Sequence, residues 1–175
     1  MRVTGGNLKG FQLNSGFATH VRPSTDFMRE GIFNFLMHEK GIENASVLDL
    51  FSGSGIVSLE FLSRDAGSVL SVDADMKNVK FQQRIKKELK LDPWEITKDD
   101  VFRFLNTNES TFDLIFADPP YDLPNIQNLT KLAYQFLNAG GIFIFEHKPE
   151  LVLTQNFKWK KQYGHATCSI FVREN

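Results

Sequence analysis

The chain has 175 residues, of which 42% are hydrophobic and 23% charged, and its formal net charge is −1. This length predicts one domain with a sizeable core, and the composition excludes a disordered chain. The near-zero charge gives no overall attraction to acidic partners, so a nucleic-acid surface would have to come from local patches. No apolar stretch is long enough for a membrane helix, and the first residues lack an apolar signal core. A cytoplasmic protein without membrane association is therefore expected.

Cysteine and histidine usage argues against a metal site. The single cysteine, Cys168, excludes an intramolecular disulfide, and the surrounding alternation ATCSIFV favours a buried, unreactive thiol. No metal-ligand spacing connects His20, His38 and His165, so no metal is expected. His147 follows a predicted strand without an acid partner, which favours a structural role over one at the rim of a pocket.

The first part of the chain predicts a small arm followed by a helix. Residues 1–20 contain two glycine-rich turns between short β-like pieces, which favour a hairpin arm. The sequence Ser24-Thr25-Asp26 is expected to cap a helix that runs to about Lys40. Its buried stripe is predicted to consist of Met28, Ile32, Phe35 and Leu36.

Apolar runs alternate with helical patterns through the centre of the chain. Strands are predicted at Val47–Phe51, Ser68–Asp73, Trp94–Thr97, Phe112–Ala117 and Gly141–Glu146. Helices are predicted at Ile56–Ser63, about Met76–Leu91 and Ile126–Leu137, the last ending at the glycines of Ala139-Gly140-Gly141. Strands that are apolar on both faces and separated by helices indicate a parallel sheet covered on both sides. With right-handed crossovers this is a Rossmann-like, doubly wound α/β domain.

The last part of the chain is different. Lys158–Tyr163 and Ala166–Val172 flank a Gly164-His165 turn, which predicts an antiparallel hairpin that closes the mostly parallel sheet. The expected organisation is therefore an arm at residues 1–20 and one α/β domain at residues 21–175.

A glycine turn follows the first predicted strand and opens a helix. It reads Asp49-Leu-Phe-Ser-Gly-Ser-Gly55, and its glycines would let the backbone approach a ligand closely. A dinucleotide site prefers G-x-G-x-x-G, whereas Ser58 occupies the third glycine position here. Asp49 would repel a pyrophosphate and attract an ammonium or sulfonium group. The pattern therefore disfavours a nicotinamide dehydrogenase and favours S-adenosylmethionine, which carries both cationic groups.

Two further acids follow the next two predicted strands. Asp73 lies at the spacing of an acid that hydrogen-bonds ribose hydroxyls. Asp100 is placed to accept a hydrogen bond from an adenine amine, with Val101 beside the ring. Each acid alone is weak evidence, because an Asp at the end of a strand is usually an ordinary turn residue, and for Asp100 the two interpretations are about equally favoured. Together with Asp49 and the glycine turn, they favour a ligand that contains a nucleoside.

In the stretch FADPPYD, the fourth predicted strand is followed by Asp118, Pro119, Pro120 and Tyr121. In such a sheet the fourth strand ends next to the first, so Asp118 is expected to face the same pocket as Gly53. The prolines fix the backbone, so nearby carbonyls accept hydrogen bonds in a preset direction. Tyr121 offers a ring on which a base can stack. A carboxylate, an aimed carbonyl and a stacking ring form a clamp for an exocyclic amine on a planar heterocycle. The alternative is a rigid loop in which the acid only caps a helix.

These motifs resemble the Rossmann-like S-adenosylmethionine-dependent amino-methyltransferases. More narrowly, the chain resembles the bacterial 16S rRNA (guanine-N2)-methyltransferase family. That resemblance is carried by MRVTGGNLKG, VRPSTDFMREGIFNFL, VLDLFSGSG, DPPYD, GGIFIFEH and YGHATCSIFV, which together span nearly the whole sequence.

The resemblance implies methyl transfer from S-adenosylmethionine to the N2 of a guanine in 16S rRNA, free or in an assembling small subunit, by a monomer. It implies a target site at Asp118, Pro119, Pro120 and Tyr121. It implies donor contacts from Arg22, Ser24, Thr25, Asp49, Phe51, Gly53, Gly55, Asp73, Asp100 and Val101. The basic residues Arg2, Lys9, Arg22, Arg29, Lys158, Lys160 and Lys161 are candidates for RNA docking, and the arm carries two of them, Arg2 and Lys9.

Two other functions remain open on the sequence. A DNA or other RNA amino-methyltransferase acting on adenine N6 or cytosine N4 would use the same clamp, although 175 residues leave little room for a DNA-recognition domain. A non-catalytic RNA-binding scaffold could keep the fold, but the intact glycine turn and DPPY argue against it.

Overall fold

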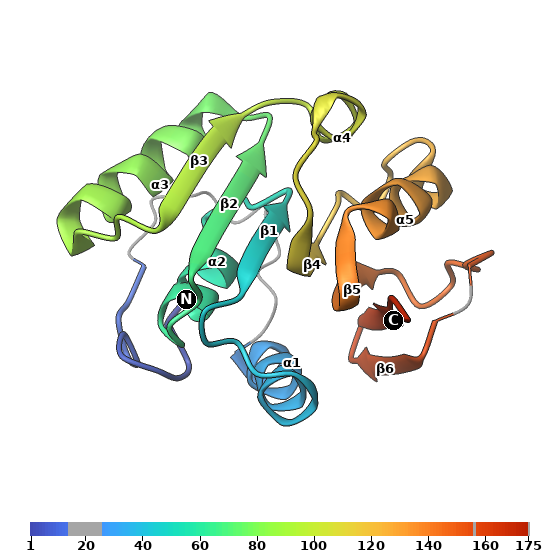
Figure 1. Ribbon diagram of the computed structural model, residues 1–175, viewed down its shortest axis with the longest axis horizontal. Coiled ribbons are helices and arrows are strands. Elements are labelled where there is room, and N and C mark those ends of the chain that lie inside the picture. Colours follow the sequence, from blue (N-terminus) through green and yellow to red (C-terminus); the bar gives the residue numbers. More distant parts are fainter. Residues whose placement is uncertain (14–25, 156, 175) are drawn as a thin grey trace.

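The computed structural model describes residues 1–13, 26–155 and 157–174, which form a sheet flanked by helices (Figure 1). The helices are α1 (Asp26–Glu39), α2 (Ile56–Leu62), α3 (Met76–Leu89), α4 (Val101–Thr107) and α5 (Ile126–Gln135). The strands are β1 (Ser46–Leu50), β2 (Ser68–Asp73), β3 (Trp94–Lys98), β4 (Phe112–Ala117), β5 (Leu137–His147), β6 (Trp159–Tyr163) and β7 (Ala166–Val172). No helix in the described ranges is long and apolar enough to cross a membrane.

The seven strands lie in the order β3-β2-β1-β4-β5-β7-β6. Strands β1 to β5 pair in parallel, and β7 and β6 add antiparallel pairing at one edge. The chain builds outward from β1 to β3 and then returns to place β4 on the other side of β1. This reversal creates a topological switch point between β1 and β4, where open α/β sheets bind ligands. The predicted fold class is confirmed, including the C-terminal hairpin.

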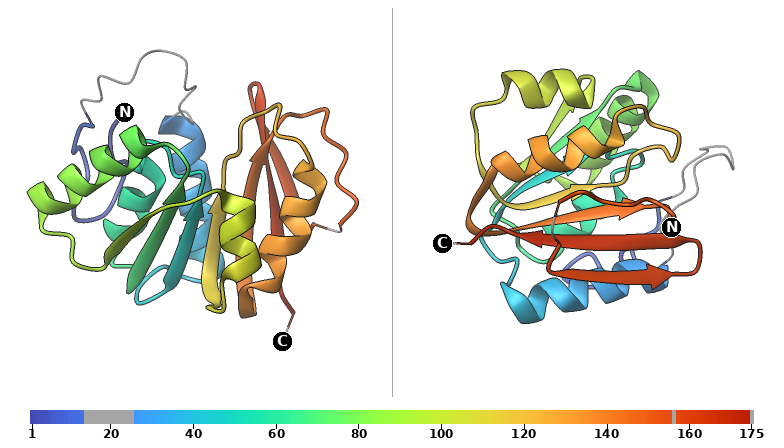
Figure 2. Two further views of the ribbon diagram at one scale, coloured as in Figure 1. Left: turned by 90° about the horizontal axis from the view of Figure 1, so that it is seen from above. Right: turned by 90° about the vertical axis from the view of Figure 1, so that its right-hand side faces the viewer.

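Helices cover both faces of the sheet, as Figure 2 shows, with α1, α2 and α3 on one face and α4 and α5 on the other. Successive residues of a strand point to opposite faces, so the core divides into two clusters. Val47 and Leu114 belong to the cluster beneath α1, α2 and α3, whereas Leu48 and Ile115 belong to the cluster beneath α4 and α5. This two-sided burial explains why the parallel strands read as continuous apolar runs.

The predicted boundaries of α5 and β5 are wrong. Helix α5 ends at Gln135, and β5 begins at Leu137. Gly140 and Gly141 therefore lie within the strand, next to a register shift against β4, instead of capping a helix. A Cβ on Gly141 would lie 2.8 Å from the carbonyl oxygen of Asn138, so this irregular backbone requires glycine. Helix α4, which precedes β4, was not predicted.

The N-terminal arm is fastened to the domain by a buried ion-pair network. An antiparallel bridge between Arg2 and Gln12 closes the arm. The fully buried carboxylate of Glu60 in α2 accepts hydrogen bonds from Thr4 N, at 2.8 Å, and from Arg64 Nη1, at 2.6 Å. Arg29 Nε donates to the same carboxylate at 3.3 Å. Arg29 is only 1% exposed, so its expected role in RNA docking is wrong.

Candidate active site

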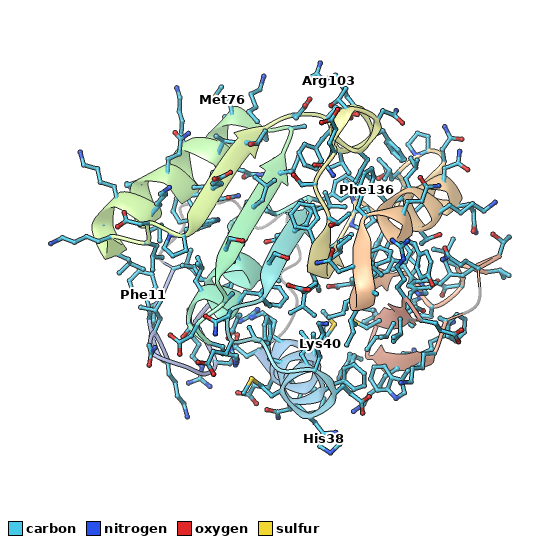
Figure 3. The ribbon with its side chains drawn as sticks, in the orientation of Figure 1. Phe11, His38, Lys40, Met76, Arg103 and Phe136 are labelled. Atoms are coloured by element: carbon cyan, nitrogen blue, oxygen red, sulfur yellow. The ribbon has the colours of Figure 1, made fainter. Side chains whose placement is uncertain are left out.

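The carboxyl ends of β1 and β4 meet at one edge of the sheet. The two strands are in parallel register, with Leu50 opposite Ala117, so Phe51 and Asp118 follow at neighbouring strand tips. The start of α3, at Met76, and Arg103 in α4 mark this edge in Figure 3. The topology therefore brings the glycine turn and the start of DPPY to adjacent positions, as the sequence predicts.

The glycine turn has an unusual backbone conformation. Phe51, Gly53 and Gly55 all have positive φ, at 58°, 52° and 77°. For Phe51 this conformation is strained, and such strain is concentrated at functional sites. The fully buried Gln82 of α3 holds the turn, because its Nε2 donates to Ser52 Oγ at 2.9 Å and to the Gly53 carbonyl at 2.8 Å.

Gly55 has a packing role that the sequence did not predict. A Cβ at this position would lie 2.8 Å from Cζ2 of Trp94 and 2.9 Å from Cγ of Gln82. Glycine is therefore required for close packing of the turn against β3 and α3, and a ligand contact at Gly55 stays a prediction. At Gly53 the nearest atom to an added Cβ is 3.8 Å away, so this glycine does leave open space.

Asp73, at the end of β2, holds the same turn from the other side. Its Oδ2 accepts a hydrogen bond from Gly53 N at 2.7 Å. Its Oδ1 accepts from Asp75 N at 2.8 Å and from Asn78 Nδ2 at 3.1 Å. A carboxylate has about four acceptor positions, so these three bonds leave capacity for a ligand hydroxyl.

Asp49 is 1% exposed and lies at the end of a line of buried polar groups. Ser58 Oγ donates to Asp49 Oδ2, Ser58 and Ser71 share a hydrogen bond of 2.6 Å, and Trp94 Nε1 donates to Ser71 Oγ at 2.7 Å. Burial raises the pKa of Asp49 to about 7. The Ser58 hydrogen bonds lower this pKa, and the negative charges of Asp73 and Asp118 raise it.

Asp118 contributes a third acid to the site. The residue is partly exposed, but protein atoms surround its carboxyl group, and this burial raises the pKa of Asp118 to about 7. The neighbouring Tyr121 is also partly exposed, and Lys148 Nζ lies 5.4 Å from the centre of its ring. Three acids therefore surround one site at the strand ends, where their negative charges repel one another unless a cation is bound.

The other predicted donor contacts are less clearly placed. Asp100 accepts a hydrogen bond from Arg103 N at 3.0 Å and caps α4, while Val101 is buried in the core. This is the ordinary turn role that the sequence left open, and a ligand contact at either residue stays a prediction. Arg22, Ser24 and Thr25 lie outside the described residues.

His147 and Cys168 have the structural roles that the sequence favours. His147 is fully buried, and its Nδ1 donates to the carbonyl of Lys148 at 2.7 Å, so Nε2 accepts from Ser169 Oγ at 2.8 Å. Burial lowers the pKa of His147, which keeps the ring neutral. Cys168 is buried, and burial raises its pKa well above the ordinary value. Among the described residues, no group of His, Cys, Asp or Glu is arranged to hold a metal ion.

Sequence reasoning missed the buried residues that hold the glycine turn and Asp49, which are Ser58, Ser71, Gln82 and Trp94. A signal for Gln82 was available, because it is a polar residue on the same helical stripe as Val79 and Ile85. Ser58 gave a similar signal within the apolar helix IVSLEFL. Polar residues at core positions require hydrogen-bond partners, and here the partners belong to the site.

The chain is similar to known proteins over nearly its whole length. Residues 1–172 match the family described as "Conserved hypothetical protein 95". The chain belongs to this family. Relatives include the "Putative rRNA methyltransferase YlbH" of Bacillus subtilis, 34% identical over 98% of each chain. The "Ribosomal RNA small subunit methyltransferase D" of Buchnera aphidicola is 33% identical over 97% of this chain and 92% of its own length.

Solved structures show the same fold. The "Putative methyltransferase yhhF from Escherichia coli" has a TM-score of 0.87 and 25% identity over 99% of this chain and 98% of its own. A Thermus thermophilus 16S rRNA N2 G1207 methyltransferase, in complex with AdoMet and guanosine, has a TM-score of 0.76 and 23% identity. This chain spans 49% of that larger protein. The architecture is therefore that of the Rossmann-like methyltransferases, and the predicted family resemblance is confirmed.

Proposed function

We propose that this protein transfers a methyl group from S-adenosylmethionine to the exocyclic N2 of a guanine in small-subunit rRNA. The observation that carries the proposal is the meeting of three acids, Asp49, Asp73 and Asp118, around a glycine turn at the switch point between β1 and β4. Such a site repels phosphate and attracts a cation. The names of the relatives support an rRNA substrate, and the Thermus neighbour supports guanine N2.

The donor site fits the chemistry of a nucleoside that carries a cation. Asp49 and the open side of Gly53 would hold the ammonium and sulfonium groups, and Asp73 has acceptor capacity for ribose hydroxyls. When bound, S-adenosylmethionine supplies a methyl carbon made electrophilic by its positive sulfur. Phe51, Asp100 and Val101 are proposed to complete the donor contacts, as are Arg22, Ser24 and Thr25.

The target site is proposed to lie at Asp118–Tyr121. A guanine amine is a poor nucleophile, because its lone pair is delocalised into the ring. Asp118 and a backbone carbonyl beside Pro119 would each accept one amine hydrogen, which directs the lone pair toward the methyl carbon. Tyr121 would stack on the base after it leaves its RNA helix. Transfer would form the new C–N bond and break the C–S bond of the donor, whose electron pair would stay on sulfur. The methylated nitrogen would then release a proton to Asp118 or to water.

In this mechanism Asp118 does not need to be a strong base. The donor is already activated, so alignment of the two reactants supplies much of the rate gain; well-oriented groups contribute about 7–11 kcal/mol. The pKa of Asp118, raised by burial to about 7, falls when a cation binds nearby, and the ionised carboxylate is then available as an acceptor.

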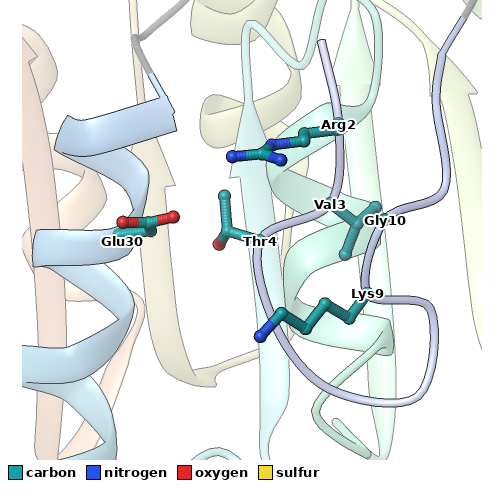
Figure 4. A pocket seen from close by; sticks show the side chains of 6 residues that line it. All are labelled: Arg2, Val3, Thr4, Lys9, Gly10 and Glu30. Carbon is teal, nitrogen blue, oxygen red and sulfur yellow. The ribbon is translucent and has the colours of Figure 1, made fainter.

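RNA docking is proposed to use the arm at residues 1–20 together with the domain surface. A cavity of about 230 Å³ separates the arm from α1 and is lined by Arg2, Val3, Thr4, Lys9, Gly10 and Glu30. Figure 4 shows the charged groups of Arg2 and Lys9 on the arm side of this cavity. These two cations are candidates for phosphate contacts, although Arg2 is also paired with Asp26 at 3.0 Å. A cytoplasmic monomer is the proposed working form.

The proposal is tested by mapping methylated nucleosides in rRNA from cells with and without this protein. Loss of one N2-methylguanosine from small-subunit rRNA supports it. Loss of N6-methyladenosine or N4-methylcytidine instead would identify one of the alternative amino-methyltransferase activities. An unchanged profile, with no calorimetric binding of S-adenosylmethionine by the purified protein, would identify a non-catalytic scaffold.

A further inference from the structure

Asp49 receives its hydrogen bond through a chain of groups that come from three elements: Ser58 from α2, Ser71 from β2 and Trp94 from β3. We propose that Trp94, Ser71 and Ser58 are positioning residues that form a one-directional hydrogen-bond relay, which favours the ionised, cation-binding form of Asp49. The relay deepens the proposed donor site and rests on it only for the identity of the cation.

The direction of the relay is fixed by its two ends. An indole N–H can only donate, so Ser71 Oγ accepts from Trp94 Nε1 at 2.7 Å. An ionised carboxylate can only accept, so Ser58 Oγ donates to Asp49. Each serine hydroxyl has one hydrogen, so the 2.6 Å bond between the two serines has Ser71 as its donor. Every donor along the line therefore points toward Asp49.

Protonation of Asp49 at this oxygen reverses or breaks the relay. A carboxyl O–H pointing at Ser58 would force the Ser58 hydrogen toward Ser71, whose own hydrogen would then lose its acceptor. All four residues are at most 1% exposed, so bulk water cannot readily satisfy the displaced group. An unsatisfied buried donor is costly, and the relay therefore favours the ionised carboxylate.

The need for such a device follows from the surroundings of Asp49. The charged groups that face it are Asp73, at the end of β2, and Asp118, after β4, and both disfavour a further negative charge. Burial disfavours that charge as well, and together these effects raise the pKa of Asp49 to about 7. The Ser58 hydrogen bonds act in the opposite direction. Without the relay, Asp49 would be largely neutral at neutral pH and would hold a cation poorly.

The relay also connects the charge of Asp49 to the shape of the glycine turn. The indole that starts the relay fills the space that a Cβ on Gly55 would need, with Cζ2 only 2.8 Å from that position. Trp94 is fully buried, so the ring cannot move to solvent. One side chain thus packs beneath the turn and orients the hydroxyls that reach Asp49.

The test is a pH titration of Asp49 in the ligand-free protein. The titration is monitored by ¹³C NMR of the carboxyl groups in protein with selectively labelled aspartate, and the Asp49 signal is identified by its loss in Asp49→Asn. Ser58→Ala removes the last donor and keeps the Cβ and the backbone N–H. Because hydrogen bonds to charged groups are strong, this variant is expected to raise the pKa of Asp49 by about one unit or more. Trp94→Phe keeps a ring beneath Gly55 but removes the first donor, and a smaller shift in the same direction is expected.

Ser63→Ala is the matched control. Ser63 is also a buried serine, it caps the other end of α2, and its hydroxyl bonds to Gly5 O at 2.6 Å on the side of the arm. This variant is expected to lower stability without moving the titration of Asp49. If Ser58→Ala does not give folded protein, Trp94→Phe and Ser71→Ala carry the test.

An Asp49 titration that is unchanged in the relay variants, or that moves equally in Ser63→Ala, would overturn the relay. This result does not depend on methyl transfer or on the donor. Calorimetric titration with S-adenosylmethionine then addresses the function separately. A relay shift accompanied by weaker donor binding at pH 7 supports both proposals, whereas a relay shift in a protein that never binds the donor supports the relay and contradicts the proposed function.

Discussion

Asp73 Oδ2 accepts a hydrogen bond from the backbone nitrogen of Gly53 at 2.7 Å, which ties the end of β2 to the turn after β1. The same carboxylate accepts from Asp75 N at the start of α3. Asp73 therefore holds the glycine turn of the candidate donor site in its conformation without a ligand. Its proposed contact with ribose hydroxyls is an additional role for a residue that already shapes the turn.

Asp73→Ala is expected to weaken binding of S-adenosylmethionine at least tenfold, which corresponds to about 1.4 kcal/mol. The variant loses both the hydrogen bond to Gly53 and the proposed ribose acceptor. Isothermal titration calorimetry measures the change. Asp75→Ala is the control, because it removes only the N-cap bond to Lys77 N at 2.8 Å and should lower stability by about 1 kcal/mol. Equal binding by wild type and Asp73→Ala would contradict the assignment.

Asp118→Ala is expected to abolish methyl transfer while donor binding stays within a few-fold of the wild type. The carboxylate is proposed to grip the target amine, whereas the donor is held mainly by residues after β1 and β2. Single-turnover transfer to small-subunit rRNA and donor calorimetry are measured in parallel. Asp122→Ala, an exposed acid in the same loop, serves as control and should retain activity. A loss of donor affinity as large as the loss of transfer would place Asp118 in the donor site instead.

Donor binding is expected to strengthen as pH rises from 6 to 8. Burial raises the pKa of both Asp49 and Asp118 to about 7, so each carboxyl is partly protonated, and neutral, below that pH. A cationic ligand favours the ionised forms, and its binding should therefore release protons near pH 6.5. Calorimetry in two buffers of different ionisation enthalpy counts these protons. A dissociation constant that is independent of pH, with no proton release, would argue against acids that face the cation.

The same shift predicts how stability depends on pH. In the unfolded chain Asp49 loses its proton near pH 4, whereas in the folded protein it keeps that proton until about pH 7. The contribution of Asp49 to the free energy of unfolding therefore decreases progressively as pH rises from about 4 to 7. Above about pH 7 its effect is constant. Asp49→Asn should therefore gain stability relative to the wild type between pH 4 and pH 8, as measured by urea unfolding. A difference in unfolding free energy that is the same at both pH values would contradict the raised pKa.

Glu60→Gln is expected to destabilise the fold by about 3–5 kcal/mol, because it removes the buried carboxylate that Arg29 and Arg64 share and leaves Arg29 with its ion pair to Asp26. Local hydrogen exchange at Thr4 N should accelerate, since that amide donates to Glu60 at 2.8 Å. Glu30→Gln, an exposed acid on α1, provides the control and should change stability by less than about 0.5 kcal/mol. Retained stability and unchanged protection in Glu60→Gln would show that the arm is held by other contacts.

The position of β4 beside β1 and the place of the site could be predicted, because they depend on the alternation of strands and helices and on the residues that follow each strand. Asp118 directly follows the run Phe112–Ala117, and Asp73 is the last residue of the run Ser68–Asp73. Because the carboxyl ends of parallel strands lie at the same edge of a sheet, both acids had to lie at that edge. The end of α5 could not be placed, because the glycines after Leu137 suit a helix cap and a strand bulge equally well. Pairing with β4, a long-range interaction, decided between them.

The supports of the site were harder to foresee, since they depend on which side chains meet across elements. Ser58 was noted only as a missing glycine, whereas its hydroxyl contacts Asp49. Trp94 appeared as an ordinary strand residue, but it lies beneath Gly55 and donates to Ser71. Arg29 was expected at the RNA surface on the basis of its charge, and its burial depends on Glu60, which is 31 residues away in the chain. Hydrophobic periodicity identifies the buried face of a helix or strand, but it does not identify the polar side chain of another element that forms a hydrogen bond or ion pair there.

The central claim is that a donor methyl group beside Gly53 and an amine held by Asp118 face each other across the tips of β1 and β4. A crystal structure with S-adenosylhomocysteine and guanosine tests it most directly. We expect the guanine to stack on the Tyr121 ring, with N2 within hydrogen-bond distance of Asp118 and directed toward the sulfur. A guanosine bound elsewhere, or a Tyr121 ring turned away from the turn at Gly53 with no space for a base, would contradict the claim.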